Sequence, residues 1–223
     1  MLLEIPNILN AKELEVVRSA LDNAPFVDGK LSAGMAAQRV KNNEEVDVRS
    51  QDVQQLNNLV MTRLVQHPTY RAAALPMKVA SPFYARYSKG MSYGDHVDDP
   101  IMQADTPYRS DISITIFLSD ASEYEGGELV INTQYGEHRV KLSAGDAVMY
   151  PSSSVHHVNE VTSGSRMVAV TWLQSLVREP AKRELLYDMY QVKEQLLKDV
   201  PDDENTKRLD RSYVNLIRMW GDV

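Results

Sequence analysis

The chain has 223 residues, of which 43% are hydrophobic, and this size and composition suit one globular domain, alone or with an appended lobe. Its net charge of −7 argues against nucleic acid and anionic membranes as partners, because both attract clustered positive charge. The chain has no cysteine, which excludes disulfides, iron–sulfur clusters and thiolate zinc sites. Any bound metal must therefore be held by nitrogen and oxygen ligands.

The first residues, MLLEIPNILNAKELE, lack the basic segment and the long apolar stretch of a signal peptide. No later stretch approaches the roughly eighteen apolar residues that a membrane span needs. We therefore expect a cytoplasmic protein that uses neither a membrane nor a nucleic acid as a partner.

Residues 1–75 have mainly helical patterning. Asn10 and Glu13 are spaced as a capping box before the first helix, and Ser50 is a candidate cap for the second. Between these helices lies VDGKLSAGMAAQRVKNN, residues 27–43, which is rich in small residues and contains two glycines. This segment predicts a mobile loop or a hairpin, and its glycines suit a lid that closes over a substrate.

From about residue 77 to residue 177 the pattern changes to short apolar or alternating runs separated by turn residues. Their spacing predicts an antiparallel sandwich or barrel. The runs are KVASPFYARY, DISITIFLSD, GELVINT, HRVKL, DAVMYP, VHHVNEV and RMVAVTWL. Helical spacing returns after Glu179, and we expect a division into a domain of residues 1–177 and an extension of residues 178–223. The helices of the extension are expected to dock on the sheet domain or to form a homodimer contact.

The stretch GDHVDDP, residues 94–100, contains a candidate metal-binding pair. On an extended strand, residues two apart point to the same face, so His96 and Asp98 can present a ring nitrogen and a carboxylate oxygen to one ion. Asp99 then points to the other face. The alternative is a surface histidine that pairs with a carboxylate and binds no metal.

A second candidate region, YPSSSVHHVNEVTSGSRMVAVTW, covers residues 150–172. Two extended runs flank a three-residue segment that ends in Gly164, and the last residue of such a hairpin loop favours the left-handed conformation that glycine adopts easily. If Val161 pairs with Ser165 in this hairpin, Arg166 lies opposite Glu160. All even-numbered residues of the two strands then share one face.

This shared face selects one of two adjacent histidines. His156 lies on the same face as Arg166, whereas His157 points to the opposite face. Glu160, which lies opposite Arg166 in this pairing, is about 13 Å along the strand from His156. A small dicarboxylate and the two long side chains can bridge this distance. The pattern therefore predicts His156 as the third metal ligand.

Two imidazoles and one carboxylate form the facial ligand set of non-haem Fe(II) oxygenases. Three ligands on one face of an octahedron leave three positions for a bidentate 2-oxo acid and O₂. The planar fork of Arg166 can hold the far carboxylate of such a co-substrate through two charge-assisted hydrogen bonds. The alternative for Arg166 is an ion pair with Glu160.

Four motifs of the sequence resemble one known family. It is the Fe(II)/2-oxoglutarate dioxygenases of the prolyl 4-hydroxylase type, and within it the bacterial PKHD-type hydroxylases. The resemblance covers nearly the whole chain, including its helical C-terminal end. The motifs are YARYSKGMSYGDHVDD, SITIFLSDASEYEGGELVI, AGDAVMYPSSSVHHVNEVTSGSRMVAVTW and SYVNLIRMWGDV.

The resemblance implies an α+β fold: a double-stranded β-helix, or jelly roll, with flanking N-terminal helices and a helical C-terminal lobe. It implies a hydroxylase that couples oxidative decarboxylation of 2-oxoglutarate to succinate with substrate hydroxylation, and that depends on Fe(II) and ascorbate. It also implies site residues, which are the iron ligands His96, Asp98 and His156 and the 2-oxoglutarate-binding residues Arg166, Tyr87 and Trp172.

The sequence departs from the prolyl hydroxylases around the co-substrate anchor. Those enzymes usually carry Cys-Pro-Val after the distal histidine and a lysine as the anchor, whereas here residues 159–161 read Asn-Glu-Val and the anchor is Arg166. The resemblance therefore does not extend to peptidyl-proline, and we expect a small molecule or a protein side chain as the substrate. The competing hypothesis is a cupin-like metal-binding module without oxygenase activity, which would have no need for a cation at Arg166.

Overall fold

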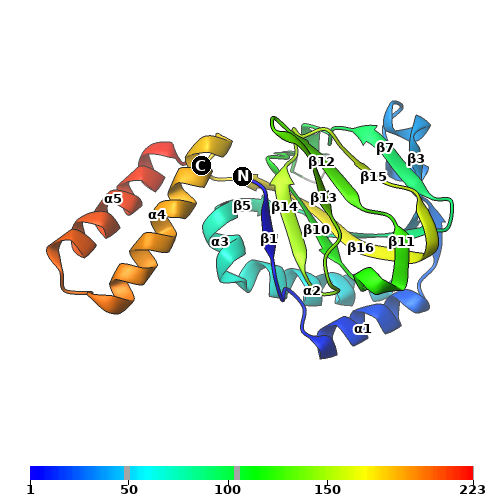
Figure 1. Ribbon diagram of the computed structural model, residues 1–223, viewed down its shortest axis with the longest axis horizontal. Helices are drawn as coiled ribbons and strands as arrows, with labels where there is room; N and C mark the ends of the chain where they lie inside the picture. The colour runs from blue at the N-terminus through cyan, green and yellow to red at the C-terminus, as the bar shows by residue number, and fades with distance from the viewer. Residues whose placement is uncertain (48–50, 103–105, 223) are drawn as a thin grey trace.

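Two antiparallel sheets form the body of the protein in the computed structural model, which describes residues 1–47, 51–102 and 106–222 (Figure 1). The larger sheet has the order β1-β14-β10-β16-β6-β4-β2, and β5 and β11 also pair with β16. Its strands are β1 (Leu3–Ile5), β2 (Phe26–Asp28), β4 (Glu44–Val46), β5 (Pro76–Val79), β6 (Phe83–Ser88), β10 (Ile112–Phe117), β11 (Tyr124–Gly126), β14 (Ala147–Pro151) and β16 (Val161–Ser175).

The smaller sheet has the order β13-β12-β15-β7-β3 and faces the larger one. A separate pair, β8 (Ile101–Met102) with β9 (Tyr108–Arg109), follows β7 in the chain. The strands of the smaller sheet are β3 (Lys41–Asn42), β7 (Ser92–His96), β12 (Leu129–Thr133), β13 (Gly136–Val140) and β15 (His156–Val158). The jelly roll expected from the sequence is confirmed.

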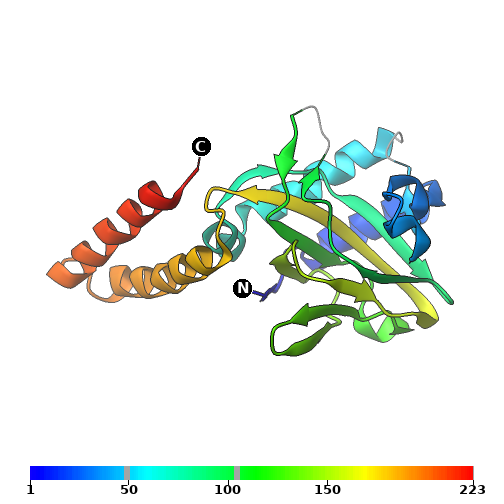
Figure 2. The same cartoon turned by 90° about the horizontal axis from the view of Figure 1, so that it is seen from above.

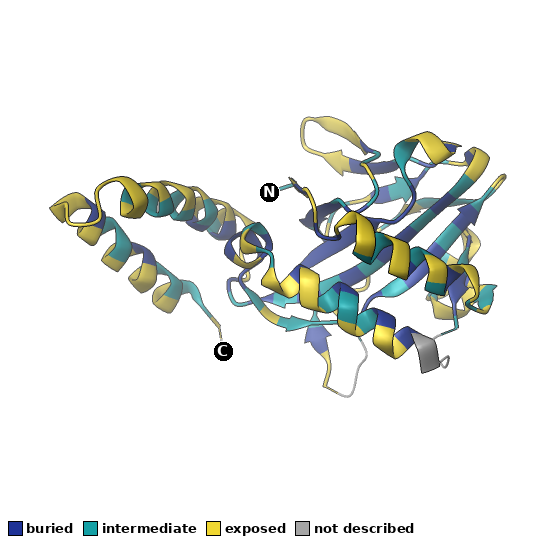
Figure 3. Cartoon of the chain, turned by 90° about the horizontal axis from the view of Figure 1, so that it is seen from below, coloured by how far each residue is buried: buried dark blue, intermediate teal, exposed yellow. Residues whose placement is uncertain are grey.

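Strand β10 shows how the two faces of the larger sheet are used. Ile114 and Ile116 belong to the hydrophobic core that includes helices α1 (Ala11–Asp22), α2 (Gln51–Gln66) and α3 (Pro68–Ala74). Phe117 belongs to a second core with residues of the smaller sheet. Because side chains alternate along a strand, Ser113 and Thr115 share the inner face with Phe117. These two polar residues therefore lie between the sheets, where the site is built. Figure 3 shows that much of the sheet strands is buried or half-buried, whereas the outer sides of the helices are exposed.

The predicted capping box at the start of α1 is confirmed. The Asn10 side chain accepts hydrogen bonds from the backbone of Lys12 and Glu13, and the Glu13 carboxylate accepts one from the Asn10 backbone at 3.0 Å. These bonds satisfy N–H groups that have no partner inside the helix. The candidate cap Ser50 of α2 lies outside the described residues.

The N-terminal third is less helical than its patterning predicts, because it contains four short strands. Residues 27–43 do not form a hairpin, since β2 pairs with β4 of the larger sheet and β3 pairs with β7 of the smaller one. Two 3₁₀ turns, Gly29–Ser32 and Ala37–Arg39, connect β2 to β3. The segment thus crosses from the larger sheet to the smaller one.

The two C-terminal helices, α4 (Pro180–Asp199) and α5 (Glu204–Trp220), form a hairpin that projects from the sheets (Figures 1 and 2). The hairpin docks on the domain at its root, through a small core of Leu75, Val177, Leu186 and Tyr213. Arg183 is buried there and donates to the carbonyls of Val177 and Arg178. No helix in the described part of the chain has the length and apolarity of a membrane span.

Candidate metal centre and co-substrate pocket

The structure brings His96, Asp98 and His156 together between the sheets. His96 is the last residue of β7, Asp98 follows that strand, and His156 is the first residue of β15. The two histidines are direct partners in the β7–β15 register, and their ring centroids are 4.1 Å apart. One ligand atom from each of the three residues lies within 4.8 Å of the others, close enough for the three to hold one metal ion.

Each histidine is held so that its Nε2 is available as a ligand. The Nδ1 of His96 is 2.9 Å from the Gly94 carbonyl, and the Nδ1 of His156 is 3.0 Å from the Ser154 carbonyl. A carbonyl only accepts, so Nδ1 carries the proton and Nε2 keeps its lone pair. Burial, together with the neighbouring His156, lowers the pKa of His96 to about 4. His96 is therefore neutral at pH 7, as a metal ligand must be.

Two serines orient the carboxylate ligand. The Ser113 hydroxyl donates to one oxygen of Asp98, and the Ser113 and Ser152 hydroxyls are 2.7 Å apart. The other oxygen of Asp98 lies 3.8 Å from His156 Nε2 and faces the shared position. Neither serine was predicted from the sequence. Ser113 could have been noticed as a polar residue at an inner position of a largely apolar strand.

Aromatic rings pack against both imidazoles. Tyr93 stacks on His96 with a centroid distance of 3.6 Å and an interplanar angle of 11°, and Tyr150 contacts His156 edge-on at 5.1 Å. Burial raises the pKa of both tyrosines, so each is a neutral phenol. The rings restrict the orientation of the histidines, and sequence reasoning assigned neither tyrosine a role.

A cavity of about 680 Å³ contains this candidate metal-binding group and the predicted anchor Arg166. Arg166 lines it from β16 of the larger sheet, whereas His156 lines it from the smaller sheet. The Arg166 side chain is 1% exposed, and its Nε has no hydrogen-bond partner among the described residues. Arg166 thus supplies to the same cavity a buried cation that has no ion pair among the described residues.

The predicted hairpin between residues 156 and 172 is wrong. Strand β16 runs unbroken from Val161 to Ser175, and β15 pairs with β12 and β7 instead. Gly164 does adopt φ +74°, but within β16, where a Cβ would lie 2.1 Å from the carbonyl oxygen of Glu123. Among the ion pairs of the described residues, none joins Arg166 to the exposed Glu160. His156 and Arg166 meet because the two sheets face each other.

The other two predicted co-substrate residues also line the cavity, at different positions. Tyr87 pairs with Arg166 in the β6–β16 register, and its ring centroid is 5.0 Å from the guanidinium carbon. Burial raises the pKa of Tyr87 to about 12, with Arg166 opposing the shift. Trp172 lies opposite Ser113 in the β10–β16 register, about 20 Å along the strand from Arg166. Its indole N–H is buried without a partner among the described residues.

Two features near the site are not brought into it as ligands. His157 bonds Asp95 at 2.8 Å and Asn159 at 3.2 Å, on the opposite face from His156, as the alternation predicts. Asp99 is exposed at the edge of the cavity.

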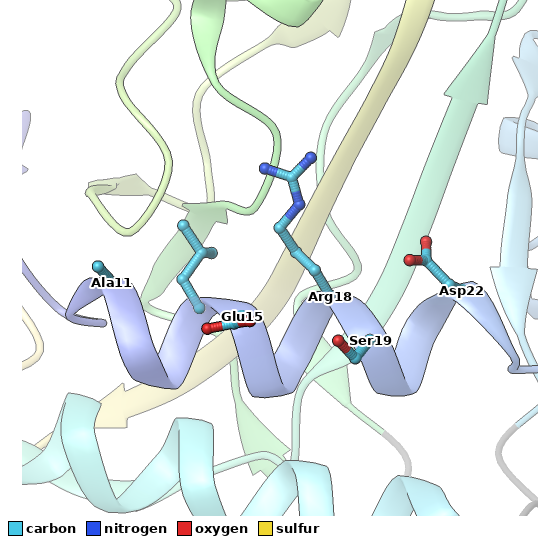
Figure 4. Close-up of a pocket in the computed structure, with 6 residues that line it drawn as sticks. Ala11, Glu15, Arg18, Ser19 and Asp22 are labelled. Atoms are coloured by element: carbon cyan, nitrogen blue, oxygen red, sulfur yellow. The ribbon is translucent and has the colours of Figure 1, made fainter.

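A shallow groove lies apart from this site, along α1 (Figure 4). Its only basic residue, Arg18, is committed to a two-point ion pair with Glu123 at 2.8 and 2.9 Å. The groove therefore has no free cation and no histidine, and we assign it no role.

A charged pair in the cavity wall was not predicted from the sequence. Lys41 of β3 and Glu45 of β4 are 5% and 6% exposed and form an ion pair. In the sequence they belong to the polar stretch KNNEE, which resembles a solvated surface segment. Their burial arises only from the crossing of residues 27–43 between the sheets.

Comparison with known proteins agrees with this geometry. Residues 82–174 match the family model of the 2OG-Fe(II) oxygenase superfamily, and residues 181–222 match that of the PKHD-type hydroxylase C-terminal domain. A PKHD-type hydroxylase of Thioalkalivibrio sulfidiphilus is 53% identical over 224 residues and covers 100% of both chains. A PKHD-type hydroxylase of Caulobacter sp. is 42% identical over 227 residues, again with 100% of both chains covered.

Two solved structures illustrate the shared fold. HygX from Streptomyces hygroscopicus, solved with nickel, 2-oxoglutarate and hygromycin B, has a TM-score of 0.57 and 16% identity, covering 80% of this chain and 84% of its own. A Pseudomonas putida prolyl-4-hydroxylase has a TM-score of 0.53 and 16% identity, with 78% and 92% covered. These likenesses support the jelly-roll fold, and the full-length relatives establish the family: the chain belongs to the PKHD-type hydroxylases of the 2OG-Fe(II) oxygenase superfamily.

Proposed function

We propose that this protein is a hydroxylase that uses Fe(II), 2-oxoglutarate and O₂ to hydroxylate a small molecule or a protein side chain. One observation carries the proposal: the His96, Asp98 and His156 donors share a cavity with the buried guanidinium of Arg166, which has no ion pair among the described residues. A site that only stored a metal would gain nothing from this cation, whose burial without a partner is costly.

The donor set fits a divalent iron ion. We propose that Nε2 of His96, Nε2 of His156 and one Asp98 oxygen hold it, while Ser113 keeps the second Asp98 oxygen bonded and the carboxylate oriented. With Fe(II) bound, the site would use O₂ to oxidise 2-oxoglutarate to succinate and CO₂ and to hydroxylate the substrate, with one oxygen atom of O₂ going to each. The three residues line the cavity, so an ion that they hold would be accessible from it.

We propose that Arg166 binds the far carboxylate of 2-oxoglutarate and that Tyr87 donates a hydrogen bond to it. A guanidinium fork matches a carboxylate through two parallel hydrogen bonds. The raised pKa of Tyr87 keeps its hydroxyl protonated, so it can donate beside the guanidinium. Trp172, which neighbours Ser113, is proposed to donate its free indole N–H near the metal end of the co-substrate.

Several further assignments are proposals from the sequence. Residues 27–43 contribute Gly34 and Met35 to the cavity lining, which supports the lid proposal. A lid predicts slower deuterium exchange in this segment once substrate and 2-oxoglutarate are added, and unchanged exchange would contradict it. Ascorbate as a supporting reductant, a cytoplasmic location, a homodimer contact and the division after residue 177 stay predictions.

The direct test is succinate formation from 2-oxoglutarate by Fe(II)-loaded protein in air, with and without candidate substrates. His96→Ala and Asp98→Ala are expected to abolish it, because each removes a ligand. His157→Ala is the matched control, since this histidine is adjacent to His156 but points away from the cavity. Absence of any 2-oxoglutarate turnover in protein that binds iron would instead indicate a cupin-like metal-binding module.

A further inference from the structure

We propose that Lys41 and Glu45 are the substrate-recognition pair of this enzyme, and that they select a neutral carboxamide group attached to an apolar body. The inference rests on the proposed function, because it treats the space left in the cavity beside the metal and 2-oxoglutarate as the substrate site.

The pair lies in the cavity and comes from both sheets. Lys41 belongs to β3 of the smaller sheet and Glu45 to β4 of the larger one, and both line the space that His96 and Arg166 also line. At 5% and 6% exposure they are as removed from bulk water as core residues. Lysine and glutamate are almost never buried unless they are paired, so the burial of each depends on its partner.

Both partners have hydrogen-bonding capacity left. The Lys41 ammonium donates to a Glu45 oxygen and, at 2.8 Å, to the Ser32 hydroxyl. An ammonium has three N–H groups, so one has no acceptor among the described residues. The second carboxylate oxygen of Glu45 accepts no hydrogen bond from the described residues. The wall therefore offers at least one donor and one acceptor.

The neutral pair favours a neutral polar group. A ligand carboxylate or ammonium would enter the cavity with its full charge, while Lys41 and Glu45 already neutralise each other, and its desolvation would not be repaid. A free amino acid would have to desolvate two charges. A carboxamide brings a carbonyl that accepts from Lys41 and an N–H that donates to Glu45, at a much smaller desolvation cost.

The surroundings of the pair favour an apolar body. The Lys41 ammonium lies 5.4 Å from the ring centroid of Tyr93 and 5.8 Å from that of Phe83. Tyr93 in turn stacks on His96, so a single ring separates Lys41 from the metal-binding group. The lining also includes apolar side chains that reach solvent, Met35 at 87% and Val97 at 49% exposure. An apolar molecule held by its amide at Lys41 would thus extend along Tyr93 toward the metal.

A purely structural role is the competing explanation, because the pair also ties the two sheets together. Such a role would change stability alone. Replacing a buried ion pair with apolar groups often leaves stability unchanged, so stability does not account for retaining the pair. The two explanations differ in what they predict for ligand selectivity.

The test uses the full-length protein loaded with Zn(II) and 2-oxoglutarate, so that no turnover is needed. Four probes share a phenyl tail and differ in the polar group: 3-phenylpropanamide, 3-phenylpropanoate, 3-phenylpropylamine and L-phenylalanine. Dissociation constants are measured by ligand-detected NMR. The amide is expected to bind at least about tenfold more tightly than the other three, because only it matches the neutral donor–acceptor pair.

Variants of the pair should change this selectivity in a defined direction. Glu45→Gln leaves the Lys41 charge uncompensated, so the preference is expected to shift from the amide to 3-phenylpropanoate. Lys41→Met is expected to weaken amide binding at least about tenfold. Lys30→Met, an exposed lysine of the same segment that does not line the cavity, is the matched control and should bind like the parent.

Three results would overturn the inference: no preference for the amide, amide binding unchanged in folded Lys41→Met, or unchanged selectivity in Glu45→Gln. Thermal melting identifies any variant that does not fold, and the remaining variant then decides. Loss of amide selectivity together with intact 2-oxoglutarate turnover would refute only the role of the pair. Intact selectivity without turnover would refute only the proposed hydroxylase activity.

Discussion

Replacing Arg166 by methionine should weaken 2-oxoglutarate binding without lowering the stability of the free protein. In the free protein Arg166 is 1% exposed, and its Nε has no hydrogen-bond partner among the described residues. A buried donor without a partner costs about 1–3 kcal/mol, and contacts of the cation with the rings of Tyr87 and Phe117, at 5.0 and 5.5 Å, offset part of this cost. We therefore expect Arg166→Met to leave the free energy of unfolding unchanged or to raise it by up to about 2 kcal/mol.

With 2-oxoglutarate present, the substitution should instead make the variant less stable than the parent protein. Removing one partner of a buried, hydrogen-bonded charge pair costs about 2–5 kcal/mol. This loss corresponds to an increase of at least about 30-fold in the dissociation constant of 2-oxoglutarate. The melting temperature of the parent protein should rise as 2-oxoglutarate is added, because the ligand binds only the folded state. The variant should lose this rise.

The assay is thermal unfolding of Zn(II)-loaded protein across a 2-oxoglutarate titration, with Arg139→Met as the control. Arg139 is an exposed arginine of β13, with 62% of its side chain accessible. A 1 kcal/mol change shifts the melting temperature of a chain of this size by about 2–4 °C, which is readily measured. An unliganded Arg166→Met protein destabilised by more than about 2 kcal/mol, or one with unchanged 2-oxoglutarate affinity, would refute the reasoning.

Three further predictions address the metal ligand shell and the fold. Ser113→Ala should weaken iron binding by about 10- to 100-fold, because it frees the Asp98 carboxylate; a metal titration that gives the parent affinity would contradict this. Asn10→Ala should lower the free energy of unfolding by about 1 kcal/mol by removing the α1 cap, as measured by urea denaturation. Ile114→Ala should cost about 2–5 kcal/mol in the same assay, since Ile114 is fully buried between the larger sheet and the helices, and a loss below 1 kcal/mol would count against that packing.

The position of the candidate metal-binding residues in the cavity could be predicted because strand alternation does not depend on the partner strand. The sequence placed His156 and Arg166 on one shared hairpin face, and the hairpin is absent. Both side chains nevertheless point inward, since each strand has one face toward the space between the sheets. His156 therefore lines the cavity and His157 does not, although the predicted strand pairing is wrong.

The strand partners could not be predicted, because they are set by contacts between distant parts of the chain. His156 pairs with His96, sixty positions earlier, and nothing in the local sequence specifies this neighbour. The same limit applies to Lys41 and Glu45, whose polar neighbours indicate an exposed segment. Only the packing of the N-terminal strands against both sheets buries this pair.

The pairing of β1 with β14 has a consequence for the order of folding. Leu3 lies opposite Met149 on the edge of the larger sheet, so β1 has no partner strand until β14 has been synthesised. Bringing such distant segments together closes a very long loop, and chains rich in these contacts fold slowly. Strand β1 must therefore avoid aggregation until β14 is available. It has only three residues and is followed by a proline, and both features limit pairing with other chains.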